Sequence, residues 1–391
     1  MKKLVAGLYY HPEVFPPTLN AVTELSHCFD EIHLVYRPHI KGAWKYPANV
    51  HQVPSGRLIS STEQENAPLP KKIFFFLQFT WYLFKQCRKK TTVVLLYDHI
   101  AFYAYCLIRP FIQGRPVLWY HNHDIAEITK LRKYSVGWLA CRAEKSNFNR
   151  VDIFTLPSAE RLQFFPVEKL RGQYFVIPNY PAISFYAPFY RPGRHAAGSI
   201  RLLFQGRIGG GHGLEEIMAL LPRPIAGREA TLVLKGYCDP AYKEELVKLA
   251  SAYNVEEKLQ FIGFTPYADV PAVTASCDIG IGIFAKMEVM HVTLGSASNK
   301  LYEYAAAGLP VLYLNEKHFS GYLSKYEWAF PVQLNSGSIH EQIEKIMNGY
   351  EQYSAAAHKD FMQTLNFERV FKPVVDYLDS IGVTKKNQPP A

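Results

Sequence analysis

The residues best suited to chemistry lie in one short segment of the second half of the chain. Residues 296–314 read SASNKLYEYAAAGLPVLYL. Ser298 can cap a helix over residues 299–307, Gly308 suits the left-handed residue that ends it, and Pro310 prevents its continuation. The apolar run after Pro310 predicts a buried strand. The segment is therefore expected to place a short helix directly before a strand.

Three polar side chains lie on overlapping faces of this expected helix: Asn299, Lys300 and Glu303. An ionised carboxylate only accepts hydrogen bonds, so a vicinal diol such as a ribose or a sugar ring suits Glu303. The amino end of the helix suits a phosphate group. The alternative is that Glu303 pairs with Lys300 on a solvated helix face.

Size and composition limit the possible classes of protein. The 391 residues are 48% hydrophobic, which is enough for two domains of ordinary size. The formal charge of +9 indicates anionic partners, which include nucleic acid, a membrane surface and phosphorylated substrates. The six cysteines form no CxxC pair or His cluster, so we expect no zinc site, no disulfide framework and a reducing compartment. We expect neither a signal peptide nor a membrane-spanning helix.

Apolar runs alternate with helical patterns along the chain, which is typical of α/β proteins with parallel sheets. The first run is followed by a helix over residues 21–29, which makes a βαβ start. A last helix is expected over residues 366–381. The expected strands span residues 4–9, 32–36, 92–97, 117–124, 151–155, 174–177, 200–204, 231–234, 259–262, 277–283 and 311–314.

A polar cluster ends the expected strand at residues 117–124, which read VLWYHNHD. His121 and His123 point the same way if the strand persists, and Asp124 can orient one of them. Ligands bind at the carboxyl ends of parallel strands, so this cluster is a candidate site. The alternatives are a metal site, for which no third ligand has a recognisable spacing, and two histidines that serve only the structure.

A glycine-rich loop follows the strand at residues 200–204. Residues 205–213 read QGRIGGGHG, and a helix is expected from Leu214. Glycines let backbone N–H groups approach an anion, and the helix dipole supports its binding. The loop could also be only a flexible connection, because it matches neither the Walker A nor the GxGxxG pattern.

An aromatic segment flanked by cations lies at residues 71–90, which read KKIFFFLQFTWYLFKQCRKK. It is too short to span a bilayer, but such a composition suits a helix at a membrane surface. A core helix packed on the sheet is the other interpretation, because an apolar strand follows directly.

Several of these motifs resemble those of retaining GT-B glycosyltransferases, in particular the large family 4. The segment from Asn299 is similar to the family string Asn-Lys-x-x-Glu-Tyr-x-x-x-Gly-x-Pro-Val. The end of the strand before Asp124 is similar to x-His-x-His-Asp, and Ile177-Pro178-Asn179 is similar to the Ile-Pro-Asn that ends the first domain. The resemblance implies an α/β fold of GT-B type, with two Rossmann-like domains whose parallel sheets face a central cleft.

The resemblance also implies a division of the chain. An acceptor-side domain is expected over residues 1–181 and a nucleotide-sugar-binding domain over residues 199–365. Residues 182–198 contain two prolines, with Pro181 directly before them, and few aliphatic residues, which indicates a linker. A helix within residues 366–384 is expected to cross back to the first domain, and residues 385–391 are expected to be disordered.

The resemblance assigns roles to individual residues. Arg207 and Lys300 would stabilise the departing nucleoside diphosphate, and Glu303 would hold the ribose. His123 would lie over the sugar near the reacting carbon. His121 and Asp124 would line the acceptor side. The other implied donor-binding residues are Gly206, His212, Phe264, Ser298 and Asn299.

The chain departs from the family pattern at three places. His212 stands where the family motif Gly-Arg-x-x-x-x-Lys-Gly has its lysine, and a histidine is only partly charged at neutral pH. Gly295 stands eight residues before Glu303, where many members have a glutamate that holds sugar hydroxyls. Residues 13–20 read EVFPPTLN in place of the usual glycine-rich turn.

The resemblance implies retaining hexosyl transfer from a nucleotide sugar, with a UDP-sugar favoured, to a glycan, polysaccharide or lipid-linked acceptor of the cell envelope. The chain has no Asp-x-Asp motif, so no catalytic metal or other cofactor is expected. We expect a cytoplasmic protein without a nucleic-acid partner, which contacts the cytoplasmic face of the membrane through residues 71–90. The alternatives are a nucleotide-sugar epimerase on the same fold and a catalytically inactive module that binds a nucleotide or a membrane.

Overall fold

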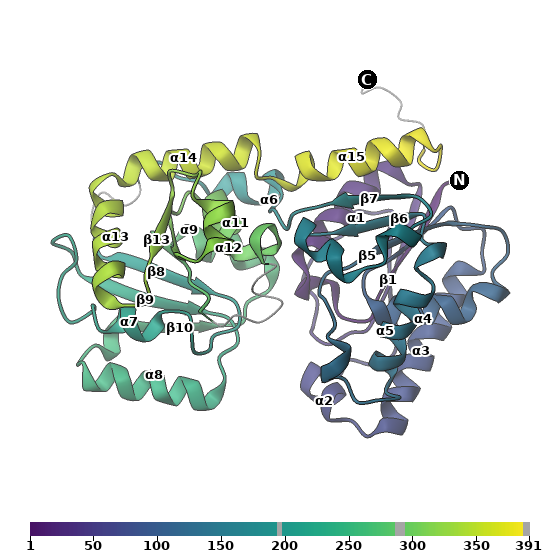
Figure 1. Ribbon diagram of the computed structural model, residues 1–391, viewed down its shortest axis with the longest axis horizontal. Helices are drawn as coiled ribbons and strands as arrows, with labels where there is room; N and C mark the ends of the chain where they lie inside the picture. Colours follow the sequence, from purple (N-terminus) through teal and green to yellow (C-terminus); the bar gives the residue numbers. More distant parts are fainter. Residues whose placement is uncertain (194–197, 286–293, 386–391) are drawn as a thin grey trace. The chain divides into compact units, whose positions relative to one another are not determined.

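The computed structural model describes residues 1–193, 198–285 and 294–385 of the chain (Figure 1). Its elements are helices and parallel strands that alternate along the chain, as the sequence predicts. Within the described ranges, no helix is both long enough and apolar enough to cross a membrane.

The chain divides into two compact units. Unit 1 comprises Met1–Pro178 together with Val370–Ala391, and unit 2 comprises Asn179–Arg369. Helix α15 (Phe367–Ser380) therefore begins in unit 2 and ends in unit 1. Each unit has its own parallel sheet with helices on both faces.

Unit 1 has a seven-stranded sheet in the order β3-β2-β1-β4-β5-β6-β7, and its neighbouring strands are parallel. The sequence did not predict β3, because this edge strand is mostly exposed and lacks an apolar run. Strand β5 ends earlier than expected, so His123 lies in the loop after it. The strands are β1 Lys3–Leu8, β2 Glu31–Tyr36, β3 Val50–Pro54, β4 Val93–Leu96, β5 Val117–His121, β6 Ile153–Leu156 and β7 Gln173–Val176.

The helices of unit 1 cover both faces of this sheet (Figure 1). Helices α3, α4 and α5 share one apolar core with β1, β4, β5 and β6. On the other face, Phe371 of α15 stacks on Trp119 with 6.0 Å between ring centroids. The backbone N–H of Lys385 donates to the carbonyl of Cys28 at the end of α1. The helices are α1 Pro16–Cys28, α2 Ser61–Asn66, α3 Leu69–Cys87, α4 His99–Ile108 and α5 Val136–Ser146.

The cation-flanked aromatic segment forms α3, which is apolar on two sides. Phe76, Phe79 and Leu83 are buried in the core of unit 1. Phe74 and Trp81 are 59% and 51% exposed. The core interpretation is therefore correct for one side of the helix, while the other side presents aromatic rings to solvent.

Unit 2 has a six-stranded parallel sheet in the order β10-β9-β8-β11-β12-β13. Branched aliphatic side chains fill most strand positions, as expected for strands that are covered on both faces. The strands are β8 Ile200–Gln205, β9 Ala230–Lys235, β10 Leu259–Gly263, β11 Ile279–Gly282, β12 Val311–Leu314 and β13 Ala329–Val332.

Two apolar cores flank the sheet of unit 2. One includes α7, α8 and α13, and the other includes α6, α11, α12 and α14. The residues expected to form a linker contain α6, whose Tyr186 is fully buried in the second core. Helix α6 is therefore packed within unit 2, because the tyrosine ring supplies the apolar surface that the aliphatic count missed. The helices are α6 Ile183–Tyr186, α7 Leu214–Met218, α8 Pro240–Ala252, α9 Val270–Ala275, α11 Asn299–Ala306, α12 Lys317–Leu323, α13 Ser336–Asn348 and α14 Tyr350–Gln363.

Helix α11 packs directly on β11 because the strand has glycine where the helix approaches. A Cβ atom on Gly280 would lie 2.2 Å from the ring of Tyr304. The hydroxyl oxygen of Tyr304 in turn accepts a hydrogen bond of 2.9 Å from the backbone N–H of Gln205. A buried glycine thus sets the depth at which α11 lies on the sheet.

We predict that Gly280→Ala lowers the free energy of unfolding of the chain by about 1–3 kcal/mol, because the added methyl group displaces the Tyr304 ring. Gly321→Ala is the matched control, since nothing lies within 4 Å of a Cβ atom at that helical position. The control is expected to stabilise α12 by up to about 1 kcal/mol. Urea denaturation measures both, and equal stabilities of the two variants would contradict the prediction.

Candidate functional site

Three neighbouring strands of unit 2 end in glycines at the carboxyl edge of the sheet. Gly206, Gly236 and Gly263 follow or end β8, β9 and β10, with φ angles of 124°, 128° and 76°. A Cβ atom on Gly236 would lie 2.0 Å from the carbonyl oxygen of Gly206. The left-handed backbone and this close approach both require glycine. The three loops therefore leave their strands side by side, with little side-chain bulk between them.

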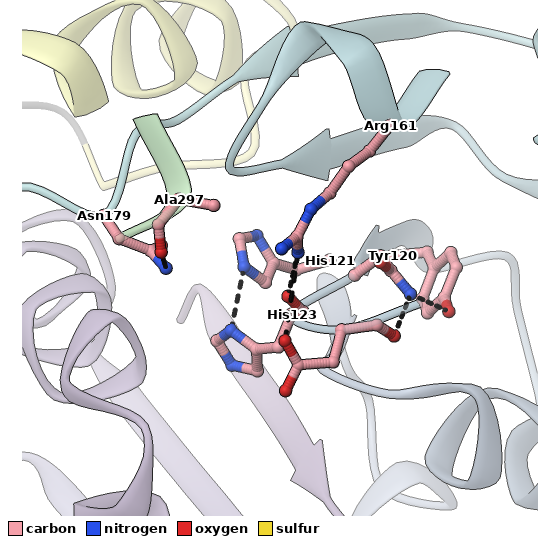
Figure 2. Close-up of polar contacts among 8 residues, drawn as sticks. Tyr120, His121, His123, Arg161, Asn179 and Ala297 are labelled. Atoms are coloured by element: carbon pink, nitrogen blue, oxygen red, sulfur yellow. Dashed lines mark hydrogen bonds and ion pairs between the residues drawn. The ribbon is translucent and has the colours of Figure 1, made fainter. Parts of the chain in front are cut away.

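Helix α11 begins at the residue that the sequence predicts. Ser298 occupies the N-cap position but makes no side-chain capping bond, so the expected capping role of its hydroxyl is not seen. Gly308 has a φ angle of 74°, as expected for the residue that ends the helix. The loop before the helix is held by Asn179, whose Nδ2 donates to the carbonyl of Ala297 at 2.7 Å (Figure 2).

The carboxylate of Glu303 is enclosed within unit 2, where only 5% of the residue is exposed. Nε2 of Gln205 donates to its Oε2 atom. The side chains of Tyr186 and Tyr267 also face it and help to lower its pKa. Thr274 Oγ1 donates to Oε1 of Gln205 at 3.0 Å and so orients the amide. The alternative that Glu303 lies on a solvated helix face is therefore wrong.

Burial dominates the electrostatics of this carboxyl group. It raises the pKa of Glu303 to about 6, although the charge of Lys235 and the hydrogen bonds from its neighbours lower it. Lys235 ends β9 and is itself buried, which lowers its pKa. At neutral pH a buried carboxylate thus accepts hydrogen bonds beside a buried cation. Sequence reasoning missed Lys235, Tyr186 and Tyr267, because they come from segments distant in the sequence.

The ammonium group of Lys300 lies between two aromatic rings. Its Nζ atom is 4.1 Å from the ring centroid of Phe204 and 4.7 Å from that of Phe284. A Cβ atom on Gly206 would lie 3.0 Å from this Nζ, so the glycine leaves room for the ammonium group. Burial lowers the pKa of Lys300 to about 7, although the charge of Glu303 raises it.

The remaining candidates of unit 2 have different surroundings. His212 stacks near Phe204, with 4.5 Å between ring centroids, and its Nδ1 donates to the carbonyl of Ile283 at 2.9 Å. Arg207 is exposed in the glycine-rich loop. Phe264 is 61% exposed after the end of β10, so it is not part of the core. Asn299 is the first residue of α11.

Gly295, which stands where the family resemblance would place a glutamate, has no room for a side chain. A Cβ atom on Gly295 would lie 2.5 Å from the ring of Tyr322 in α12. The backbone N–H of Gly295 donates to Nε2 of His318 at 3.3 Å. The ring of Tyr322 therefore lies where a side chain at this position would otherwise extend.

In unit 1, the two candidate histidines form one hydrogen-bonded chain, part of which is drawn in Figure 2. Nε2 of His121 is 3.2 Å from Nδ1 of His123. The outer nitrogens are 2.8 Å from the hydroxyl oxygens of Thr155 and Thr18, respectively. All four ring nitrogens are therefore engaged within the unit.

The ring of His123 also has aromatic neighbours on both faces. Its centroid lies 4.7 Å from that of Phe15 and 5.2 Å from that of Tyr97, with interplanar angles of 12° and 7°. Burial lowers the pKa of His121 to about 3 and that of His123 well below its usual value. Both imidazoles are therefore neutral at physiological pH, so neither supplies a charge.

A buried arginine accompanies this pair, and sequence reasoning missed it. Arg161 is 1% exposed, and its Nη1 donates to the carbonyl of His123 (Figure 2). The same atom lies 3.9 Å from Oδ1 of Asp124. The sequence predicts that Asp124 orients a histidine, whereas in the structure the threonines hold both rings and Asp124 lies near Arg161. Arg161 follows the end of β6. Because ligands bind at the carboxyl ends of parallel strands, this position was the signal in the sequence that could have identified its segment.

A cavity of about 560 Å³ lies at the opposite, amino edge of the unit 1 sheet, around the starts of β5 and β6. It is separate from the histidine pair, because the two lie at opposite ends of β5. It is lined by Tyr105, Cys106, Arg109, Arg115, Pro116, Leu118, Asn149, Arg150, Asp152 and Arg171.

Residues 191–359, all in unit 2, match the model of the family described as glycosyl transferases group 1. No curated protein matches the chain. Among solved structures, a sucrose-phosphate synthase from Thermosynechococcus elongatus has a TM-score of 0.67 at 12% identity over 97% of this chain and 99% of that one. Anabaena HepE in complex with UDP-glucose has 0.63 at 15% identity over 97% and 100%. WaaG, a glycosyltransferase involved in lipopolysaccharide biosynthesis, has 0.59 at 13% identity over 96% and 99%.

The comparisons agree with the fold that the motifs predict. The two parallel-sheet units and the likeness over nearly the whole chain give a GT-B fold. The predicted resemblance to group 1 glycosyl transferases is confirmed for residues 191–359. The membership of family 4 and the retaining stereochemistry stay predictions.

Proposed function

We propose that this chain, whose residues 191–359 match the group 1 glycosyl transferases, transfers a hexosyl group from a nucleotide sugar to an acceptor hydroxyl with retention of configuration. One observation carries the proposal. A cation at the amino end of α11, Lys300, lies beside the glycine-rich loop, and an enclosed carboxylate, Glu303, follows one turn later. This arrangement suits a diphosphate next to a ribose.

The diphosphate would be bound at the loop after β8. Lys300 and the exposed Arg207 supply charge, and the amino end of α11 supplies backbone N–H groups and the positive end of its dipole. As the sugar leaves, negative charge develops on the diphosphate, and these groups stabilise it without a metal ion. His212 would contribute a hydrogen bond in place of the lysine of the family motif.

The nucleoside would be bound beside the same loop. Glu303 would accept the hydroxyls of the ribose, with Gln205 and two tyrosines holding its carboxylate in place. The exposed ring of Phe264 offers a face for stacking on the base. HepE was crystallised with UDP and with UDP-glucose, which supports a uridine donor.

We assign His123 to the donor sugar, as the family resemblance implies. Its neutral imidazole would exchange the hydrogen bond with Thr18 for one with a sugar hydroxyl. The acceptor hydroxyl would attack from the side of the leaving group, and its proton would pass to the departing phosphate. His121 would keep its partner in one orientation, while Asp124 would contact the acceptor.

The acceptor would be a glycan, a polysaccharide or a lipid-linked sugar on the cytoplasmic face of a membrane. Phe74, Leu77 and Trp81 are exposed on one side of α3. Nζ of Lys85 lies 5.2 Å from the centroid of Trp81. Exposed aromatic rings with adjacent cations suit the headgroup region of an anionic membrane. This side of α3 would therefore hold the protein near a lipid-linked acceptor.

We predict that UDP or a UDP-sugar raises the melting temperature of the chain equally with and without Mg²⁺, whereas GDP, ADP and CMP do not. Glu303→Gln is expected to weaken this binding by about 10–100-fold, because a carboxylate hydrogen bond to the ribose becomes a neutral one. Thermal-shift titration measures both. Glu244→Gln, at an exposed carboxylate of α8, is the control and should bind as the wild type does.

Two outcomes would count against these assignments. Unchanged affinity in Glu303→Gln would exclude its role at the ribose. A chain that binds no nucleotide at millimolar concentration would instead favour an inactive module, and a nucleotide-dependent inversion of the sugar without an acceptor would favour an epimerase.

We predict that UDP affinity falls as the pH rises from 7 to 9. The free protein has a Lys300 pKa of about 7, and a bound diphosphate raises it, so binding takes up a proton in this range. The expected loss is up to about tenfold per pH unit. Lys300→Arg keeps its charge and should remove this dependence. Calorimetry in buffers of different ionisation enthalpy measures the proton uptake, and equal heats in all buffers would contradict the prediction.

We predict that His123→Ala lowers kcat by about 100-fold while the Kd for UDP stays within about threefold, because the imidazole contacts the sugar and not the nucleotide. His27→Ala, at an exposed position of α1, is the control. Steady-state kinetics with the UDP-sugar found by the thermal-shift panel measure kcat, and circular dichroism checks the fold. An equal loss in kcat and in UDP affinity would make His123 a binding residue.

A further inference from the structure

Three side chains that can ligate a metal lie together on the outer strands of the unit 1 sheet. Glu31 and His33 are two residues apart on β2, so they lie on the same face. The parallel register pairs His33 with His51 on β3. The ligand atoms of the three residues all lie within 4.8 Å of one another. The strand register therefore brings two imidazoles and one carboxylate together.

The orientation of His33 suits a metal ligand. Its Nδ1 lies 2.7 Å from Oε1 of Gln86, an amide oxygen that can only accept, so Nδ1 carries a proton. Its Nε2 therefore faces Glu31 and His51. In metal sites, a ligating histidine almost always donates its other N–H in this way, which sets the ring and the tautomer.

A buried lysine lies on the strand next to this group, because the parallel register of β1 and β2 pairs Lys3 with Glu31. Its Nζ donates to the backbone carbonyl of Gln86 at 3.2 Å and so has a partner of its own.

We propose that Glu31, His33 and His51 bind one divalent transition-metal ion, with Zn²⁺ preferred and water as the fourth ligand. Two histidines and one carboxylate are a known donor set for Zn²⁺, with bonds of about 2.0–2.2 Å. The ion would enter between Nε2 of His33 and the carboxylate, which are in direct contact without it.

The site would have a structural role that is separate from sugar transfer. Strand β3 is an edge strand, so β2 is its one neighbour in the sheet. The connection between the two strands also contributes the backbone N–H groups of Ala43 and Trp44, which donate to Oε1 of Glu13 at 2.8 and 3.0 Å. An ion bound by residues of both strands would link β2 to β3 close to the point where this connection enters β3. The link would make it harder for β3 to separate from β2.

Zinc titration of the untagged, full-length chain tests the proposal. The protein is stripped with a chelator and kept reduced with a phosphine, because half-buried Cys106 and Cys238 can also bind zinc. Calorimetry is expected to give one Zn²⁺ per chain, and Co²⁺ should give the visible absorption of a tetrahedral site.

The variants distinguish this site from unspecific binding. His51→Ala and Glu31→Gln each remove a ligand and should weaken Zn²⁺ binding by more than tenfold. Because His51 is exposed, its replacement should not affect folding. Gln86→Ala should weaken binding about tenfold by releasing His33. His340→Ala is the matched control, because His340 lies 3.7 Å from Glu344 on the surface of α13 but has no third ligand in the described group.

The zinc affinities of the wild-type chain and its variants decide whether these three residues bind the ion. Loss of the stoichiometric site in His51→Ala and Glu31→Gln, with wild-type binding in His340→Ala, would support the proposal. Wild-type zinc affinity in His51→Ala, or no binding by the wild-type chain at 100-fold excess of metal, would overturn it. Circular dichroism of each metal-free variant shows whether a loss reflects unfolding. Because metal binding is measured directly, the result does not depend on the proposed transferase activity.

Discussion

The enclosed carboxylate of Glu303 is the constraint on which the candidate donor site depends. Removing an ionised carboxylate from water costs several kcal/mol unless hydrogen bonds and charge compensate. Here the compensation comes from Gln205, Tyr186, Tyr267 and Lys235, which lie on four separate segments of unit 2. The donors can surround the carboxylate only when the sheet, α6 and the turn before α9 have all packed. The surroundings of Glu303 therefore form only when unit 2 has folded correctly.

Close packing at the edge of the same sheet explains why glycines gather there. The loops after β8 and β9 approach within the space that one Cβ atom would need, and the missing side chain of Gly206 leaves room for the ammonium group of Lys300. Aromatic rings on two sides then desolvate this group and lower its pKa. An incoming anion would restore its charge, so the cation is stronger with a ligand than without one.

The buried polar groups of unit 1 differ from those around Glu303, because the two histidines carry no net charge. Thr18 and Thr155 close the hydrogen-bonded chain at its two ends, and aromatic rings cover the faces of His123. Arg161 holds the carbonyl at the end of this loop. Such a network orients its members strongly, since each nitrogen that lost its partner would be buried and unsatisfied. The pair is thus prepared as a neutral group, which suits contact with uncharged hydroxyls better than proton transfer.

The sequence alone determined the alternation of strands and helices, the extent of α11 and the group 1 motif around Glu303, because these depend on apolar periodicity, helix-ending glycines and a contiguous string of residues. It also identified Lys300 and the two histidines as candidates. It did not reveal β3, since an exposed edge strand has no apolar run, nor the burial of Tyr186 within an expected linker. The partners of Glu303, the threonines that hold the histidines, Arg161 and the Glu31–His33–His51 group were decided only by the tertiary structure. Their members are far apart in the sequence, and no local pattern encodes contacts that exist only after the strands have paired and the helices have packed.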